Sequence, residues 1–147
     1  MTNQVLNYEI APVSGSKDNV QVFGGSVQTG GSQSLKKVYI AVDMTDISTA
    51  STVYLPSPVA GTITGIKTII NGAIGTADAI ITGKIAAVAI TDGAVTIATA
   101  SSAAGDVDSA TPSAANTVVV GSNINFTTNG ASTNTVRATI VVEITLS

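Results

Sequence analysis

The sequence predicts an all-β protein: a single β-sandwich of about eight strands that follows an extended N-terminal arm. Three observations predict this class. The apolar residues are mainly Ile, Val and Ala, accompanied by many Thr, and aromatic residues make up only 3% of the chain; β-branched side chains pack well on a pleated surface. Short apolar runs recur at near-regular spacing, with many of the 14 glycines between them, where turns need them. No segment has a convincing helical pattern, and 147 residues suit one domain.

Residues 1–34 differ in composition from the rest of the chain. They are rich in Gly, Ser, Asn and Gln, and Gly24-Gly25 and Gly30-Gly31 interrupt them. This composition predicts an arm without a core of its own. Two short segments, Val5–Ile10 and Val20–Phe23, have strand character. Two interpretations stay open: a disordered tail, or an arm that adds a strand to the sheet edge of a neighbouring molecule.

The domain expected over residues 35–147 opens with two short strands. Apolar and polar residues alternate through Lys37–Asp43, the pattern of a half-buried strand. Thr52–Leu55 repeats this pattern over fewer residues. Pro56 follows at once, and proline cannot donate to a strand ladder, so we expect the second strand to end there.

Two longer apolar segments come next. The alternation of Thr62–Ile70 slips by one residue around Gly65, which predicts a β-bulge at that point. Ala79–Ile90 is almost wholly apolar, and we interpret it as one buried strand with a kink at Gly83. A helix is the alternative for this segment, although its density of Ile and Val argues against one.

The C-terminal part predicts three strands, a turn and a long loop. In the first of these strands, Val95 and Ile97 alternate with Thr96 and Ala98. Asp92-Gly93 is typical of a tight turn, and the small, polar run Ser101–Ala115 predicts a long loop. Thr117–Phe126 alternates and predicts one strand, with Val120 on its buried face. The clearest strand is Ala138–Leu146, where a slip of one residue would expose five apolar side chains.

The residue types present exclude most catalytic chemistry. Cys and His are both absent, so the chain has no disulfide, thiolate nucleophile or imidazole base, and no structural zinc site can form. The remaining catalytic candidates are two short-spaced carboxylate pairs, Asp43 with Asp46 and Asp106 with Asp108. A glycosidase needs two carboxyls across a cleft, and a Ca²⁺ ion needs 6–8 oxygen ligands. We therefore expect no enzyme, no metal and no cofactor, and interpret Asp106–Asp108 as a solvated loop.

Charge and hydropathy also limit the partners. The chain carries six basic and nine acidic residues, which argues against nucleic acid; Lys36-Lys37 is the only adjacent basic pair. The longest apolar run, Ile85–Ile90, is far below the roughly 20 residues of a spanning helix, and the N-terminus lacks the pattern of a signal peptide. We expect neither nucleic acid nor a membrane as partner. The glycosylation triplet Asn125-Phe126-Thr127 lies inside a predicted strand, so we expect it to be unused.

Four stretches resemble a family of small bacteriophage capsid decoration, or cement, proteins. They include an entry to a core strand with the pattern proline, apolar, Ala-Gly-Thr-Ile. The four stretches are Leu55–Ile63, Ala77–Thr82, Ala103–Val107 and Thr111–Pro112 with Asn116–Val118 and Gly121. The chain departs from the family pattern at two turns: Ser122 stands where an acidic residue is expected, and Ala131 stands where a second glycine is typical.

The resemblance implies a jelly-roll-like sandwich, a homotrimer and a position on the outer surface of the phage capsid. It also implies that the arm binds the major capsid protein and that the decoration stabilises the head. The candidate contact residues are apolar and aromatic side chains of the arm: Tyr8, Ile10, Val20, Val22 and Phe23.

Two other functions are compatible with an all-β binding module. One is a phage fibre or baseplate module, or another adhesion domain, that binds a glycan on the host surface. The scarcity of aromatic residues, which commonly form the platforms of sugar sites, argues against it. The other is a pilus or surface-layer subunit, against which the absence of a signal-peptide pattern argues.

Overall fold

The computed structural model describes residues 20–23, 26–29 and 36–147. The chain divides into two units, Met1–Leu35 and Lys36–Ser147, and each is considered by itself. In the first unit, strand β1 (Val20–Phe23) pairs antiparallel with β2 (Ser26–Thr29) to form a two-stranded sheet. Two strands of four residues each are marginally stable alone.

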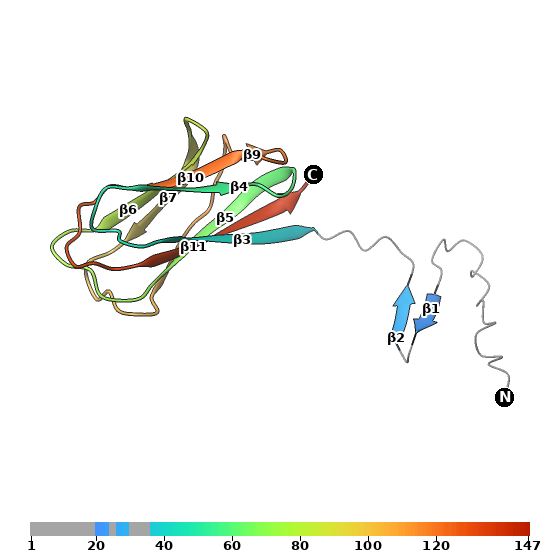
Figure 1. Cartoon of the computed structure of the whole chain (residues 1–147), viewed down its shortest axis with the longest axis horizontal. Coiled ribbons are helices and arrows are strands. Elements are labelled where there is room, and N and C mark those ends of the chain that lie inside the picture. The colour runs from blue at the N-terminus through green and yellow to red at the C-terminus, as the bar shows by residue number, and fades with distance from the viewer. Residues whose placement is uncertain (1–19, 24–25, 30–35) are drawn as a thin grey trace. The chain divides into compact units, whose positions relative to one another are not determined.

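The second unit consists of two antiparallel sheets packed face to face (Figure 1). One sheet has the order β4-β10-β6-β7. The other has the order β3-β11-β5-β8, and a short strand, β9, also pairs with β5. The nine strands are β3 (Lys37–Met44), β4 (Thr52–Pro56), β5 (Gly61–Ile70), β6 (Ala79–Ile85), β7 (Val88–Ile97), β8 (Val107–Ala110), β9 (Thr117–Val118), β10 (Asn123–Thr128) and β11 (Ala138–Leu146).

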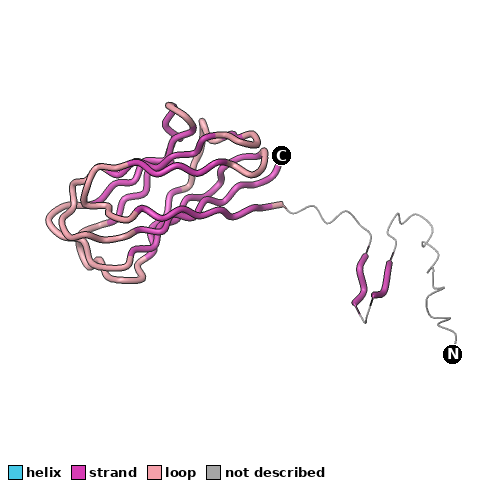
Figure 2. The backbone as a smooth tube through the Cα atoms, viewed as in Figure 1, coloured by secondary structure: helices cyan, strands magenta, loops and turns pink. Residues whose placement is uncertain are grey.

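This strand order is that of a jelly roll, in which two Greek keys are wound into a sandwich. With β9 set aside, the eight long strands cross between the two sheets after each strand except at the hairpin β6-β7. The loops therefore gather at the two ends of the strands (Figure 2). The prediction of an all-β, jelly-roll-like sandwich is confirmed, with nine strands where about eight were expected.

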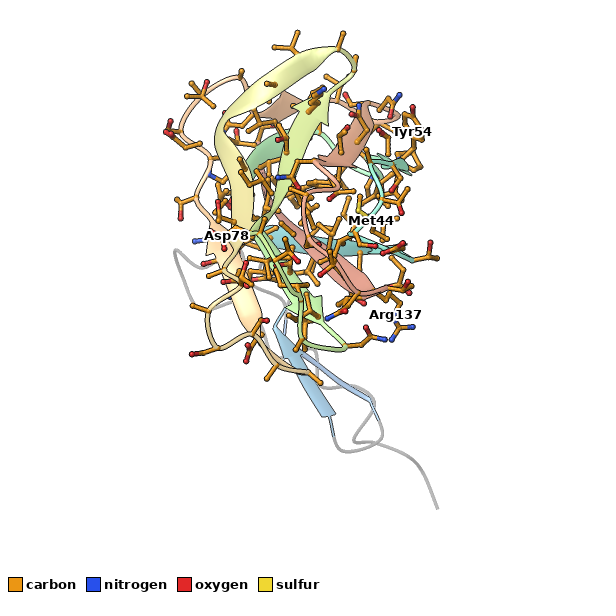
Figure 3. All side chains as sticks on the ribbon, turned by 90° about the vertical axis from the view of Figure 1, so that its left-hand side faces the viewer. Met44, Tyr54, Asp78 and Arg137 are labelled. Carbon is orange, nitrogen blue, oxygen red and sulfur yellow. The ribbon has the colours of Figure 1, made fainter. Side chains whose placement is uncertain are left out.

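The core lies between the two sheets and is built from alternating positions on the strands. Four residues of β11, at every second position from Ala138 to Ile144, are fully buried. Phe126 of β10 and Met44 of β3 are buried in the same core; Figure 3 labels Met44. β11 lies between β3 and β5 and pairs with both along nearly its whole length, so its register is set on two sides, as its sequence predicted.

The bulge predicted in β5 is confirmed. Glu143 of β11 lies opposite Gly65, but the next residue, Ile144, lies opposite Ile63. Thr64 is therefore the extra residue of β5. The slip keeps both Ile63 and Ile66 buried in the core, because a bulge moves the following side chains to the other face.

The interpretation of Ala79–Ile90 as one strand was wrong. The chain turns back after β6, and β7 begins at Val88. Ala86 adopts a φ of 52° at the turn, a conformation that glycine or asparagine usually supplies. Bonds from β10 hold it there: Ala86 N donates to Asn123 O at 2.7 Å, and Asn125 Nδ2 donates to Ala86 O at 2.8 Å.

The turn predicted at Asp92-Gly93 was also wrong, since both residues lie within β7. Along the β6-β7 ladder, Thr82 pairs with Ala94 but Lys84 pairs with Ala89. The residues between Ala89 and Ala94 therefore bulge out of the ladder, with Asp92 at a φ of 57°. A turn signal in the sequence thus marks an irregularity inside a strand.

Two further boundaries differ from the prediction. The expected loop Ser101–Ala115 contains strand β8, which pairs with β5. The expected strand Thr117–Phe126 is interrupted after β9 by a turn in which Gly121 has a φ of 82°. Val120 is consequently 70% exposed rather than buried.

Candidate functional site

One end of the sandwich, which we call the arm end, carries the first described residue of the unit and its last strand. Leu146 N donates to Lys36 O at 3.0 Å, and Leu146 also lies opposite Gly61, the first residue of β5. Gly61 pairs in turn with Val118 of β9. Figure 1 shows the C-terminus beside the start of β3 at this end. The start of β3 therefore lies at the same end of the sandwich as the β9-β10 turn.

The β9-β10 turn presents two valines at the arm end. Val119 is 64% exposed and Val120 is 70% exposed. The turn is well ordered by hydrogen bonds, because Ser122 N donates to Val119 O at 2.9 Å and Val119 N donates to Ser122 Oγ at 2.9 Å. These two adjacent exposed apolar side chains on a fixed turn are a candidate contact surface.

Backbone bonds fix this turn to the rest of the domain. Ser57 N donates to Ser122 O at 2.9 Å, and Gly121 N donates to Ser57 O at 2.8 Å. Ser57 follows directly after β4 and is itself buried. The two exposed valines are thus held by the sandwich.

The N-terminal half of β3 takes part in a network of polar side chains centred on Glu143 of β11. Lys37 Nζ lies 2.8 Å from Glu143 Oε1, and Tyr39 OH donates to Glu143 Oε2 at 2.8 Å. Thr64, the bulge residue of β5, donates to Oε1 at 2.7 Å. Thr64 also shares a hydrogen bond with Thr145 of β11 at 3.0 Å. One carboxylate therefore links three strands beside the point where the arm begins.

The network shifts the pKa of each of its titratable groups. The hydrogen bonds from Lys37, Thr64 and Tyr39, in that order, lower the pKa of Glu143 to about 2. The hydrogen bond to Glu143 raises the pKa of Lys37, and the same partner raises the pKa of the Tyr39 phenol. Glu143 is therefore ionised at every pH at which the protein is expected to act.

The opposite end of the sandwich is polar, and its loops are tied to one another. Asp78 Oδ1 accepts hydrogen bonds from Thr99 N at 2.7 Å and from Thr99 Oγ1 at 2.9 Å. These bonds lower the pKa of Asp78. Asn129 Oδ1 accepts a hydrogen bond from Ile80 N at 3.1 Å. Figure 3 shows Asp78 and Arg137 among the side chains of this part of the molecule.

The two candidate carboxylate pairs serve turns and strands in this structure. Asp46 Oδ1 accepts hydrogen bonds from Ser48 N and Ser48 Oγ, which lower its pKa. Asp43 accepts a hydrogen bond from Thr139 Oγ1 at 2.5 Å. Asp46 is thereby engaged in an Asx turn, and Asp43 is tied to the neighbouring strand.

The second pair lies at the start of β8. Asp106 Oδ2 accepts a hydrogen bond from Ala103 N at 2.6 Å. Burial, and secondly the charge of Asp106, raise the pKa of Asp108. Within residues 36–147, no three carboxylates come together in a group that could hold a metal ion.

The other candidate residues of the sandwich are placed as follows. Asn125 of the glycosylation triplet is 5% exposed, and its amide bonds Ala86 O, so the acceptor nitrogen is inaccessible in the folded chain. Lys36 and Lys37 stand at the start of β3, where Lys37 pairs with Glu143. Lys36 and Lys37 therefore do not form a basic patch, because the charge of Lys37 is paired with Glu143.

The five arm residues expected to contact a capsid lie beyond what the structure describes in full. Tyr8 and Ile10 fall outside the described residues. Val20, Val22 and Phe23 belong to β1, of which the backbone pairing alone is described. Their role stays a prediction.

Sequence reasoning missed the exposed turn at the arm end. Val118, Val119 and Val120 are consecutive valines, which break the alternation required of a half-buried strand. The following Gly121-Ser122 is a turn signal. These two signals together would have placed a turn there.

Comparison with known proteins leaves the chain without an identified relative. No family model matches it, and no curated protein matches it either.

The part of the chain that the structure describes contains no helix with the length and apolar character needed to cross a membrane.

Proposed function

We propose that this protein is a capsid decoration protein, a structural component of a phage virion. It binds the major capsid protein on the outer surface of the head and stabilises the shell, and it acts as a homotrimer. Each trimer carries three arms, so that several weak contacts combine into strong attachment. The proposal takes its starting point from the family resemblance of the sequence.

One structural observation supports the proposal and suggests which surface of the sandwich contacts the capsid. The sandwich unit begins at Lys36, whose carbonyl is bonded to Leu146 at 3.0 Å, and the exposed valines Val119 and Val120 lie at the same end. A single flat partner can therefore contact the turn while the arm reaches over its surface. The valines supply buried apolar area, and the arm supplies reach.

The direct test is co-sedimentation of the purified full-length chain with expanded, undecorated capsids. We expect the protein to pellet with the particles. At low concentration, we also expect light scattering to give a mass three times the 14.6 kDa of one chain. If the protein stays in the supernatant at all concentrations, the proposed function is wrong.

Variants separate the two contacts. Deletion of residues 1–34 should leave the sandwich folded and weaken capsid binding; equal binding by the shortened chain would refute the role of the arm. The double variant Val119→Ser, Val120→Ser should weaken binding by about tenfold to a hundredfold, as expected for two exposed apolar side chains that become buried. Val107→Ser is the matched control, since Val107 is 60% exposed but lies on β8, away from the arm end.

A further inference from the structure

The outer edge of β3 is an open strand edge. β3 is the last strand of its sheet and pairs with β11 alone. Its pairing is unbroken from Lys37 to Met44. Because Leu146 N donates to Lys36 O, the residues that face β11 are Lys36 and every second residue after it. The backbone groups of Lys37, Tyr39, Ala41 and Asp43 therefore point away from the sheet, and among the described residues none has a backbone partner.

The side chains that usually protect such an edge are held away from it. Natural proteins guard edges with charged residues, prolines or bulges. In β3, the side chains of Lys37 and Tyr39 are bonded to Glu143, and that of Asp43 is bonded to Thr139. Both partners, Glu143 and Thr139, lie on β11. Ala41, the fourth of these residues, contributes only a methyl group. The side chains thus lean over the face of the sheet and leave the backbone edge clear.

The other edges of the sandwich are shorter or interrupted. β4, the edge strand of the second sheet, has five residues and ends in Pro56, which offers no N–H group. β8, at the far edge of the first sheet, has four residues. The irregular part of β7 is bridged to the segment after β8, because Thr91 N donates to Ala114 O at 3.0 Å and Ser113 N donates to Thr91 O at 3.1 Å. Among the described edge strands, β3, with eight residues, therefore has the longest uninterrupted edge.

We propose that β3 pairs antiparallel with β3 of a second copy, about a two-fold axis at Ile40. In this register the open residues oppose one another: Lys37 meets Asp43 of the second copy, and Tyr39 meets Ala41. Four residues of each copy then exchange backbone hydrogen bonds, and the two five-stranded sheets become continuous. The interface is isologous, because the same strand serves both copies.

Charge favours a second copy as the occupant. The two-fold axis places Lys37 and Asp43 on the same face of the joined sheet, directly opposite each other, where opposite charges stabilise a strand pair. Lys37 has two more N–H donors than it uses for Glu143. Asp43 uses Oδ1 for Thr139, and its second oxygen can accept a bond from Lys37. The pairing does not rest on capsid binding, since it uses a different strand.

A register-specific cross-link tests the pairing in the full-length chain. The natural chain has no cysteine, so single cysteines report cleanly. In an oxidised mixture of Tyr39→Cys and Ala41→Cys, we expect a disulfide-linked dimer, because these positions lie opposite each other within the reach of a disulfide. Ala41→Cys alone is the control, since residue 41 of each copy lies about 9 Å from its counterpart, too far for a disulfide. Equal cross-linking in the mixture and the control would overturn the proposal.

A proline variant tests the backbone contribution. Ala41→Pro removes an N–H group that points to the open edge, while Val42→Pro removes one that faces β11. We expect Ala41→Pro to keep a melting temperature close to that of the natural chain and to reduce the mass measured by light scattering at high concentration up to twofold, as paired assemblies separate. Val42→Pro should instead destabilise the fold. An unchanged mass for a folded Ala41→Pro variant would overturn the proposal.

A second cysteine mixture tests whether the arm, rather than a second β3 strand, occupies the β3 edge. A mixture of Ala41→Cys with Gln28→Cys, which places one thiol in β2, gives a disulfide only if the arm strand lies against the β3 edge. Cross-linking here, without cross-linking between positions 39 and 41, would replace the pairing of two β3 strands by an arm-to-edge contact and overturn the proposal.

Discussion

The Glu143 network makes a prediction about stability that depends on pH. Replacing Glu143 by Gln keeps the shape of the side chain but removes the charge that Lys37, Tyr39 and Thr64 bind. The pKa of Glu143 is about 2, against an ordinary value of 4.5, which corresponds to an upper limit of about 3 kcal/mol in the free energy of unfolding. The side chain is 22% exposed and Lys37 is 49% exposed, so solvent screening reduces the expected loss to about 1–2 kcal/mol.

The sign of the pH dependence follows from the depressed pKa. The stabilisation by Glu143 is fully present above pH 4.5, the ordinary value, and is lost as the pH falls toward the folded value of about 2. Urea unfolding of the natural chain and of Glu143→Gln should therefore differ at pH 7 and converge near pH 2. Other carboxylates titrate equally in both proteins, so the difference isolates Glu143.

A double-mutant cycle divides the effect between the partners of Glu143. Lys37→Met removes the ion pair alone, and we expect its coupling to Glu143→Gln to be the smaller part of the effect, because the pair is exposed to solvent. Tyr39 and Thr64 then account for the remainder. A difference between the natural chain and Glu143→Gln that is the same at pH 7 and pH 2 would refute the network as the cause.

Two predictions concern the core and the turns. Phe126 is fully buried, so Phe126→Ala should lower the free energy of unfolding by about 3–5 kcal/mol; Phe126→Leu leaves a smaller cavity and should cost much less, and equal losses would refute cavity size as the cause. Gly121 and Gly130 both have positive φ, but an added Cβ at Gly121 meets open space, whereas at Gly130 it would overlap the backbone of Ala50. Thermal or urea unfolding should therefore give a loss of about 1–2 kcal/mol for Gly121→Ala and at least twice that for Gly130→Ala; the opposite order would refute the close approach.

The parts of the fold that could be predicted are those determined by side-chain alternation. β11 and β3 are long, regular strands with one buried face, so period-two patterning specified both their existence and their register. The bulge in β5 was also predictable, because the pattern itself slips near Gly65. In each case the information lies within a few consecutive residues.

The parts that could not be predicted depend on distant partners. Ala86 adopts a left-handed conformation without being Gly or Asn, because Asn123 and Asn125 of β10 hold its backbone from far along the chain. The bulge in β7 is likewise accompanied by bonds to the segment after β8, where Ser113 Oγ donates to Asp92. Local composition carries no sign of such contacts, so one apolar run was interpreted as one strand.

The candidate functional surfaces also divide into features that local sequence predicts and features that depend on the fold. The absence of Cys and His is evident from composition, but the position of Val119 and Val120 depends on where β9 stops and on the bonds that Ser57 makes to the turn. The open edge of β3 also required the strand order, because an edge strand and a central strand of similar length carry similar patterns.

The place of β3 in the sheet links the arm to the Glu143 network. Any pull on the arm enters the sandwich at Lys36 and Lys37, the start of an edge strand whose ladder partner, among the described residues, is β11. Strand ends open more easily than strand centres, because fewer contacts must break. Lys37 and Tyr39 are bonded to Glu143 at this vulnerable end, and Glu143 is itself bonded to Thr64 of the next strand. A load on the arm would thus be shared among three strands, as the proposed attachment through the N-terminal segment requires.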